Sequence, residues 1–355
     1  MNVCFVIQDM GLGGAATLVH DVIMNWPNDS DRIELVVFFD EFNERYSDIS
    51  RRANIIFLHK KKTIDFVFNA LLKKTILRLN PDVISSHLTC TFYLSLVLKK
   101  WKCLFTHTIH SFPDKDLPWL YRLFLKKKIK KGSIQLIGCG KNVTSLAKKL
   151  YKVDINCIAN GISINKENNS FKNDNCSFNI LTVSRLSQEK RVIDLVKAMN
   201  YIKTSKDVCL TIIGDGPMRD ELQHYLDSHK TAIKITIAGF KDSVDEFYSS
   251  SNVFCLVSER EGLPIVVLEA MNYGLPIVAT DNGGNTELVK HGYNGFLVNV
   301  GDIEGIANAL TEIINNQKLC MEFSFNSRKM LNDYSIQKTS KMYYDYFKER
   351  VDKNK

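Results

Sequence analysis

The sequence predicts two doubly wound α/β domains, each built on a parallel sheet, that face each other across a cleft. Three features of the 355-residue chain lead to this prediction. Its length suggests about two domains. Short apolar runs alternate with amphipathic segments from one end to the other, which is typical of βαβ units and parallel sheets. One polar, Asn-rich segment at 166–177 interrupts the alternation, which then starts again.

The first domain is expected to span residues 1–165. Its strand-like runs lie at 2–8, 33–39, 54–58, 82–86, 102–106, 134–138 and 154–158, and its helical patterns at 14–25, 63–79, 90–100, 116–131 and 142–150. Because ligands of open α/β sheets bind at the carboxyl ends of the strands, the cleft is the expected site.

The second domain is expected at 178–335, after the linker at 166–177. Its strand-like runs lie at 179–184, 208–213, 233–238, 253–257, 276–280 and 295–299, with helical patterns at 190–203, 218–229, 242–250, 264–273, 302–316 and 318–333. A last helix at 336–353 exceeds what the second sheet needs. We expect this helix to cross back onto the first domain.

Composition narrows the class of protein. The nine cysteines are scattered without a C-x-x-C pair, which indicates free thiols in a reducing compartment. No secretory signal is visible, and no apolar run reaches the roughly 18 residues of a membrane span, so a cytoplasmic protein is expected. Residues 1–165 carry 24 Lys and Arg against 14 Asp and Glu, a net charge of +10 within a chain total of +8. The first domain should therefore meet an anionic partner, either nucleic acid or a membrane surface.

The first motif is the glycine-rich loop GLGGAA at residues 11–16, between the first strand and its helix. Glycines let backbone N–H groups approach a phosphate, and a helix N-terminus favours negative charge. A tight turn without a ligand explains the loop equally well. Together with Asp40 at the end of the second strand, the loop also fits an NAD-dependent oxidoreductase.

The second motif is SEREGLPIVVLEAM at residues 258–271. Pro264 suits the first turn of a helix, whose free N–H groups around 262–265 would point into the cleft. Glu261 and Glu269 would lie roughly 12 Å apart along a helix, beyond the roughly 5–9.5 Å of glycosidase carboxylates. The spacing suits two acceptors that bind hydroxyls of one long ligand. An N-cap carboxylate and a solvated helix face are the alternative.

The third motif is VSRLSQEK at residues 183–190, at the end of the first strand of the second domain. Arg185 and Lys190 would face the cleft there. Fixed cations at this position could neutralise a diphosphate leaving group without a metal. A solvated basic loop is the alternative.

In their order and spacing these motifs resemble the family 4 glycosyltransferases of the GT-B fold, which has two Rossmann-like domains. The resemblance covers nearly the whole chain and is strongest from 180 to 300. It is carried by Gly13-Gly14, His110, Asn160-Gly161-Ile162, Ser184-Arg185-Leu186 with Lys190, Glu261-x7-Glu269, and residues 274–280, 283–287 and 291–298.

The resemblance implies a retaining transferase that needs neither a metal nor another cofactor. Arg185 and Lys190 would bind the donor diphosphate, and Glu269 would bind the ribose. Glu261 would hold the donor sugar, His110 would lie near the reacting carbon, and the glycine pair would approach phosphate or acceptor. The predicted catalytic residues are Glu261, His110, Arg185 and Lys190, and the predicted donor-binding residues are Gly13, Gly14, Arg185, Lys190, Gly262, Leu263, Pro264, Ile265 and Glu269.

Some residues depart from the family pattern. Ala15-Ala16 stands where an acidic residue often follows the glycine pair. His107 and His110 form H-x-x-H, but no third metal ligand has a sensible spacing, so His107 is interpreted as a satisfied strand-end residue. The segment Asp114-Lys115-Asp116 has the letters of a D-x-D metal motif but lies in a Pro-flanked loop.

The segment 117–131 is aromatic, apolar and basic, LPWLYRLFLKKKIKK. It predicts an interfacial helix on an anionic membrane, and a packing helix with a solvated basic end is the alternative. A membrane-bound position would suit a lipid-linked saccharide acceptor in bacterial surface polysaccharide biosynthesis. We therefore expect a cytoplasmic protein that is peripheral on the inner face of the cell membrane.

The expected activity is transfer of a hexose or N-acetylhexosamine from a nucleotide diphosphate sugar, with UDP as the expected nucleotide, to a saccharide. An NAD-dependent oxidoreductase would leave Arg185, Lys190 and the two glutamates unexplained. A nucleotide-sugar epimerase of the two-domain type shares the fold and is separated only weakly by the sequence, but the ordered set of motifs favours transfer. A nucleic-acid-binding protein is supported by the basic runs alone, so no nucleic-acid partner is expected.

Overall fold

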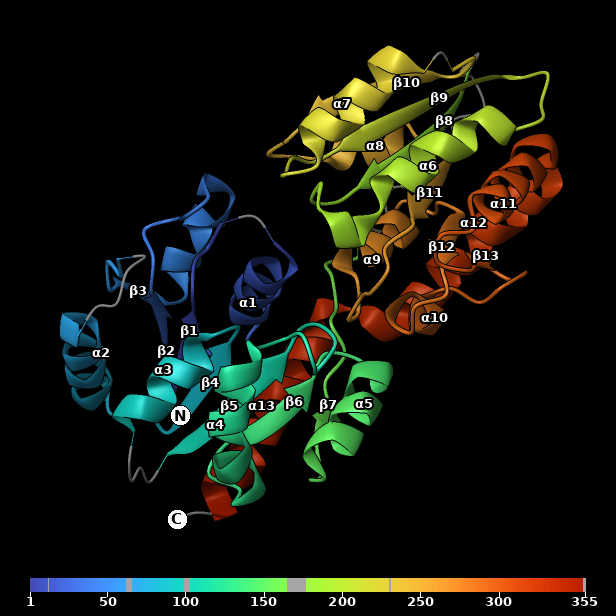
Figure 1. Cartoon of the computed structure of the whole chain (residues 1–355). Coiled ribbons are helices and arrows are strands. Elements are labelled where there is room, and N and C mark those ends of the chain that lie inside the picture. The colour runs from blue at the N-terminus through green and yellow to red at the C-terminus, as the bar shows by residue number, and fades with distance from the viewer. Residues whose placement is uncertain (12, 62–65, 99–102, 165–176, 230, 354–355) are drawn as a thin grey trace. The chain divides into compact units, whose positions relative to one another are not determined.

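The computed structural model describes residues 1–355 except 12, 62–65, 99–102, 165–176, 230 and 354–355. The chain forms two compact units (Figure 1). Unit 1 consists of Met1–Ser163 and Tyr334–Lys355, and unit 2 of Ile164–Asp333. The segment 166–176 of the expected linker lies outside the described residues, and Ser177 already belongs to the first strand of unit 2.

Unit 1 is built on a seven-stranded parallel sheet in the order β3-β2-β1-β4-β5-β6-β7. The strands are β1 (Asn2–Ile7), β2 (Arg32–Val37), β3 (Asn54–Phe57), β4 (Val83–His87), β5 (Leu104–Ile109), β6 (Gln135–Gly138) and β7 (Asn156–Cys157). The central strands are buried on both faces, so their sequences are continuous apolar runs rather than alternating ones. The strand order reverses between β1 and β4, which makes the carboxyl ends of these strands a switch point for ligands.

Helices follow most strands of unit 1: α1 (Gly14–Met24), α2 (Phe66–Leu79), α3 (Cys90–Val97), α4 (Trp119–Lys130) and α5 (Lys141–Tyr151). Each overlaps a segment whose apolar spacing predicts a helix, and α5 extends one residue beyond its segment at either end. The 3-10 helix η1 (Glu44–Arg51) was not predicted, because its sequence ERYSDISR is mostly polar. Only Tyr46 and Ile49 of η1 are buried, and they hold it against the unit.

The C-terminal helix α13 (Ile336–Lys353) belongs to unit 1 and packs against α1 and β5. Figure 1 shows it in red among the blue and green elements of that unit. The ring of Trp26 lies 6.1 Å from the ring of Phe347, and the Tyr343 hydroxyl lies 3.2 Å from Thr108 Oγ1. The chain re-enters the unit at a parallel bridge between Ile162 and Ser335, so the last helix completes the packing of the first sheet.

Unit 2 contains a six-stranded parallel sheet in the order β10-β9-β8-β11-β12-β13. The strands are β8 (Ser177–Val183), β9 (Asp207–Ile213), β10 (Lys234–Gly239), β11 (Val253–Leu256), β12 (Ile277–Thr280) and β13 (Gly295–Val298). The order reverses between β8 and β11, as it does between β1 and β4 in unit 1. The predicted fold class, two doubly wound parallel-sheet units, is confirmed.

The helices of unit 2 accompany this sheet, and one apolar core cluster packs α6, α7, α11 and α12 against it. They are η2 (Gln188–Lys190), α6 (Val192–Ala198), η3 (Met199–Tyr201), α7 (Arg219–Ser228), α8 (Asp245–Ser249), α9 (Ile265–Asn272), α10 (Gly284–Leu288), α11 (Ile303–Asn315) and α12 (Gln317–Leu331), followed by η4 (Asn332–Tyr334). The loops that follow β8, β9, β11 and β12 all leave the carboxyl edge of the sheet, where the predicted site residues of unit 2 are found.

Candidate active site

The loop after β8 carries Arg185 and Lys190 and is fixed by the loop after β9. Leu186 N donates to the Asp215 carbonyl, and Met218 N donates to the Leu186 carbonyl, both at 2.9 Å. Leu186 is 1% exposed and anchors the loop in the core, whereas the Arg185 side chain is exposed. Among the described residues Arg185 makes no ion pair. The local structure therefore places one unpaired cation at the end of the first strand of unit 2.

Two glycines make the close approach of these loops possible. A Cβ atom on Gly214 would lie 1.9 Å from the Ser184 carbonyl oxygen, and one on Gly216 would lie 2.4 Å from the Leu186 carbonyl oxygen. Gly214 also has a φ of +131°, which L-residues rarely adopt. The sequence analysis missed both residues, although the sequence GDGP directly after a strand was an available signal.

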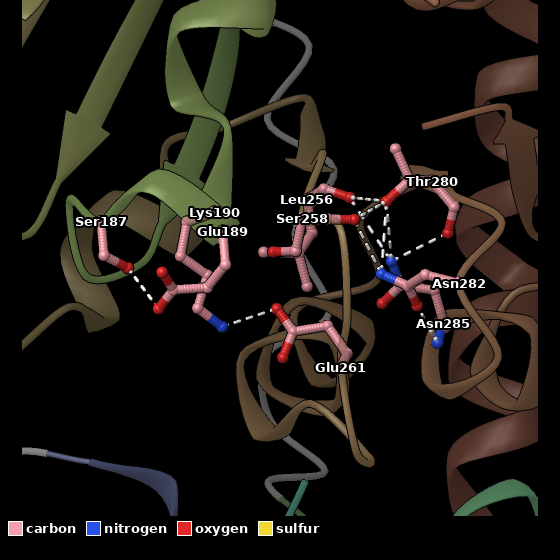
Figure 2. Close-up of polar contacts among 9 residues, drawn as sticks. All are labelled: Ser187, Glu189, Lys190, Leu256, Ser258, Glu261, Thr280, Asn282 and Asn285. Atoms are coloured by element: carbon pink, nitrogen blue, oxygen red, sulfur yellow. Dashed lines mark hydrogen bonds and ion pairs between the residues drawn. The ribbon is translucent and has the colours of Figure 1, made fainter. Parts of the chain in front are cut away.

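Lys190 and Glu261 are brought together from segments 71 residues apart. Lys190 Nζ lies 2.7 Å from Glu261 Oε1, and the two side chains are 23% and 10% exposed (Figure 2). A second contact joins the same loops, because Glu259 N donates to the Glu189 carbonyl at 2.7 Å. The predicted cation and the predicted sugar-binding carboxylate thus share one small region of unit 2.

A buried polar network holds the loop that carries Glu261 (Figure 2). The Ser258 carbonyl accepts from Thr280 Oγ1 at 2.5 Å and from Asn282 Nδ2 at 2.9 Å. Asn285 Nδ2 donates to the Thr280 carbonyl at 3.0 Å. The two hydrogen bonds to the Ser258 carbonyl hold the loop against β12 and the residues that follow it, so they orient the loop from that side. The sequence analysis did not identify these residues.

Residues 261–265 connect this loop to α9, and their main chain packs against the start of α10. A Cβ atom on Gly284 would lie 2.3 Å from the Gly262 carbonyl oxygen, which explains the glycine there. Pro264 is the N-cap of α9 rather than its first residue. Leu263 and Ile265 are 3% and 7% exposed, so their side chains belong to the core. Only their backbone groups, together with those of Gly262, are suited to bind a ligand.

Glu269 lies on α9 and is held by a tyrosine of α8. The Tyr248 hydroxyl donates to Glu269 Oε2 at 3.0 Å and lies 3.2 Å from the Val266 carbonyl. Tyr248 is 1% exposed, and burial, followed by the nearby Glu269 charge, raises its pKa well above the ordinary tyrosine value. The hydroxyl therefore stays protonated at any physiological pH and remains a donor to the carboxylate.

This contact gives a direct prediction for Tyr248→Phe. The family resemblance assigns this half-buried carboxylate to ribose binding, so loss of one hydrogen bond to it should raise KM for the expected nucleotide sugar about three- to tenfold and leave kcat nearly unchanged. Steady-state kinetics measures the split. The matched control is Tyr273→Phe, which removes the hydroxyl that bonds Asp245 at 2.6 Å and should leave KM unaltered. Equal effects of the two variants would refute a specific role for Tyr248.

In unit 1, Gly13 is the N-cap of α1 and Gly14 its first residue. Gly13 has a φ of 175°, which any residue can adopt, and a Cβ atom there would meet nothing within 4 Å. Gly11 differs, because a Cβ atom would lie 2.6 Å from Glu41 Oε1. The contact at Gly11 is with the end of a flexible side chain, and no described residue fills the space beside Gly13. The open space at Gly13 leaves room for an approaching ligand.

His110 follows β5 and belongs to a cluster of polar side chains near the carboxyl edge of the unit 1 sheet. Its Nε2 lies 2.9 Å from His87 Nδ1, and its backbone N–H donates to Asp116 Oδ1 at 2.8 Å. His107 Nε2 lies 2.8 Å from Asp116 Oδ2, and His107 Nδ1 lies 2.6 Å from Thr91 Oγ1. Both ring nitrogens of His107 thus have hydrogen-bond partners, as predicted, although His107 lies within β5 rather than at its end. Asp116 of the D-x-D segment is part of the same network.

Two further points of the sequence analysis concern Asp40, which the oxidoreductase alternative would use, and the possibility of a metal site. Asp40 Oδ1 lies 2.5 Å from His59 Nδ1, and both side chains are at least two-thirds exposed. Within the described part of the chain, no three His, Cys, Asp or Glu side chains are arranged to hold a metal ion. The described helices also include none that is long and apolar enough to span a bilayer.

Two family models together cover most of the chain. The model described as "Glycosyltransferase Family 4" matches residues 12–166, and the one described as "Glycosyl transferases group 1" matches residues 163–330. The boundary between the matches lies close to the division between the first part of unit 1 and unit 2.

Known proteins are similar to the chain in sequence and in fold. An uncharacterized glycosyltransferase of Haemophilus influenzae is 37% identical over 161 residues, 45% of this chain and 46% of that protein, so this match spans about half the relative's length. The Escherichia coli UDP-Gal:alpha-D-GlcNAc-diphosphoundecaprenol alpha-1,3-galactosyltransferase is 25% identical over 345 residues, 88% and 87% of the two chains. The crystal structure of Anabaena HepE with UDP and glucose superposes with a TM-score of 0.83, 17% identity, and 98% and 100% coverage.

The fold and these matches define the class of protein as a glycosyltransferase of the GT-B fold. More particularly, the chain belongs to the family 4 glycosyltransferases. This membership decides against an NAD-dependent oxidoreductase and a nucleotide-sugar epimerase.

Proposed function

We propose that the protein is a retaining, metal-independent glycosyltransferase that moves a hexose or N-acetylhexosamine from a UDP-sugar to a lipid-linked saccharide in bacterial surface polysaccharide biosynthesis. The observation that carries the proposal is the meeting of Lys190 and Glu261 at the carboxyl edge of the unit 2 sheet, where Lys190 Nζ lies 2.7 Å from Glu261 Oε1. The exposed Arg185 lies on the same loop as Lys190. Cations beside a carboxylate suit a ligand that carries both a diphosphate and sugar hydroxyls.

The chemistry follows from where charge develops. As the bond between sugar and diphosphate breaks, negative charge grows on the leaving oxygens and positive charge on the sugar ring. Arg185, Lys190 and the backbone N–H groups at the start of α9 would stabilise the leaving diphosphate. Glu261 would hold hydroxyls of the sugar, and Glu269, oriented by Tyr248, would accept hydrogen bonds from the ribose.

The proton of the attacking acceptor hydroxyl must be transferred to another group. We assign it to the leaving diphosphate, which departs from the same face of the sugar that the acceptor attacks, so that configuration is retained and no separate carboxylate base is required. In unit 1, Gly13 and Gly14 would approach phosphate or acceptor, and His110 would contact the donor sugar. Support for a UDP donor and a lipid-linked acceptor comes from the similar Escherichia coli galactosyltransferase, whose name includes UDP-Gal and diphosphoundecaprenol.

The reaction is tested with UDP-sugars and a diphosphoundecaprenol-linked acceptor in the presence of EDTA. We expect UDP release and, by ¹H NMR of the product, an α-linkage from an α-configured donor. Inversion at the anomeric carbon, loss of activity in EDTA, or a sugar trapped covalently on Glu261 would each refute the mechanism.

Membrane association is proposed for α4, as part of a peripheral location on the cytoplasmic face. The helix buries Leu125 and Ile129 and leaves four large apolar side chains exposed: Trp119, Leu120, Leu123 and Phe124 at 64%, 57%, 64% and 46%. Lys126, Lys127, Lys130 and Lys131 are exposed at its end. Apolar side chains beside lysines suit the interface of an anionic bilayer.

We expect the double substitution of Trp119 and Phe124 by glutamine to weaken binding to vesicles that contain phosphatidylglycerol by at least about tenfold, because each large side chain loses its apolar transfer free energy. Vesicle co-sedimentation measures the change. Phe325→Gln is the control, since Phe325 is 69% exposed on α12 of unit 2. Binding that is unchanged in the double variant would contradict the role of α4.

A further inference from the structure

We propose that Ser85 and His87 act as positioning residues that fix the His110 ring as a neutral hydrogen-bond donor through its Nδ1 atom. The inference rests on the proposed function, in which His110 contacts the donor sugar. It adds which ring nitrogen contacts the ligand and states that this nitrogen is a hydrogen-bond donor. Three features of unit 1 support it: the contact between the two rings, the anchoring of the His110 main chain, and the protons available to the network.

The two rings meet because of strand register. β4 and β5 are parallel neighbours with His87 opposite Thr108, so the last residue of β4 lies next to the residue that follows β5. His87 Nδ1 and His110 Nε2 are 2.9 Å apart. His87 is 1% exposed and stacks on Phe5 of β1, with ring centroids 6.3 Å apart and planes at 23°. A side chain fixed on both sides is a rigid support for its neighbour.

The main chain at His110 is anchored independently. Asp116 Oδ1 accepts from the His110 backbone N–H at 2.8 Å, and Asp116 Oδ2 bonds His107 Nε2 at 2.8 Å. The Asp116 and His107 side chains are 3% and 2% exposed. With the backbone held by this buried pair, the remaining freedom of His110 is rotation of its side chain. The contact with His87 removes that freedom.

The position of the protons follows from counting donors and acceptors. Ser85 is fully buried, and its hydroxyl lies 3.3 Å from His87 Nε2; within the described chain it has no other hydrogen-bond partner. A buried hydroxyl that does not donate is costly, so Ser85 donates to His87 Nε2. The proton of a neutral His87 is then on Nδ1 and is donated to His110 Nε2. The proton of a neutral His110 is consequently on Nδ1.

The opposite arrangement leaves a donor unsatisfied. If His110 donated through Nε2, His87 would donate through Nε2 to the Ser85 oxygen, and the Ser85 proton would have no acceptor among the described residues. Each arrangement leaves one polar hydrogen without a protein partner. In the first it is the Nδ1–H of His110, which is half-buried, and in the second it is the hydroxyl hydrogen of the fully buried Ser85, where the cost is greater.

Both rings are neutral at physiological pH. Burial lowers the pKa of His110 to about 4, despite the opposing effect of Asp116, and burial together with the nearby histidines holds the pKa of His87 well below the ordinary histidine value. No side chain or backbone group of the described residues bonds His110 Nδ1. A neutral Nδ1–H there suits an acceptor oxygen of the ligand, such as a sugar hydroxyl, and does not serve as a base.

Long-range ¹H–¹⁵N correlation spectra of the ring nitrogens of the full-length protein test the arrangement without substrate. Near pH 7 we expect both His87 and His110 to be neutral with the proton on Nδ1, with signals assigned through His87→Phe and His110→Ala. A proton on Nε2 of His110, or a charged His110 ring, would overturn the inference.

Two variants test the function of the arrangement. Ser85→Ala removes the donor to His87, and His87→Phe removes the donor to His110 while keeping a ring on Phe5. In both we expect the His110 proton to leave Nδ1 and kcat/KM to fall about three- to tenfold, the effect of one neutral hydrogen bond. His224→Gln, on the exposed surface of α7, should change neither quantity. An unaltered His110 spectrum in both variants overturns the inference.

The same data separate this inference from the proposed function. Full activity of His110→Ala would refute contact between His110 and the donor sugar, whatever the spectra show. An inactive His110→Ala together with a proton on Nε2 in the wild-type protein would refute only the positioning by Ser85 and His87.

Discussion

Replacing Lys190 by methionine is expected to lower kcat/KM for sugar transfer by about 100-fold or more, the usual effect of removing one group that stabilises the charge of the transition state. Lys190 Nζ lies 2.7 Å from Glu261 Oε1, and Glu261 is 10% exposed. The variant therefore loses a cation that would face the departing diphosphate and leaves a mostly buried carboxylate without its counter-ion. Steady-state UDP release measures the effect.

Two control variants test whether the loss of activity in Lys190→Met is specific to the charge at this position. Lys203→Met removes an exposed lysine of the same unit and should keep wild-type kinetics. Lys190→Arg keeps the charge in a different shape and should retain part of the activity. The role of Lys190 would be contradicted by a folded methionine variant whose kcat/KM is within threefold of the wild-type value.

Gly214→Ala is expected to give the second large effect, on both stability and donor binding. Its Cβ atom would lie 1.9 Å from the Ser184 carbonyl oxygen, and the residue has a φ of +131°. Relief of this clash must move the loop that carries Arg185. We expect the free energy of unfolding to fall by about 2–3 kcal/mol and UDP affinity to fall at least about tenfold, as measured by urea unfolding and calorimetry.

Gly132→Ala separates the clash from backbone strain. Gly132 also has a positive φ, +72°, but a Cβ atom there would meet nothing within 4 Å. We expect a loss of stability of about 1 kcal/mol and no change in UDP affinity. If the two alanine variants lose the same stability and neither affects UDP, the tight packing of the two loops has no functional importance.

The architecture could be predicted from sequence because both sheets are covered on both faces. Their strands are then continuous apolar runs, such as VCFVI of β1 and VFCL of β11, which contrast with the amphipathic helices between them. The polar η1 gave no such contrast and was missed. For residues 117–131 the sequence left two interpretations open. α4 shows features of both, since it packs through Leu125 and Ile129 and exposes Trp119 and Leu123.

The candidate site was predictable only where its residues form local motifs. Arg185 and Glu261 stand next to strand ends and were identified from their positions. The supporting residues Tyr248 and Asn282 act through contacts with segments 21 and 24 residues away. Contacts between such distant segments leave no periodic pattern in the sequence from which they could be predicted. Likewise, the role proposed for His87 depends on the strand register that places the end of β4 beside the residue after β5, and this register could not be read from the sequence.

The most direct test of the donor site is a calorimetric titration of UDP into the full-length protein in the presence of EDTA. We predict saturable binding of one UDP, at least about tenfold weaker in Arg185→Ala and Glu269→Ala than in the wild-type protein, and no binding of NAD. Absence of UDP binding, or affinity that neither substitution alters, would contradict the assignment of the donor site to unit 2.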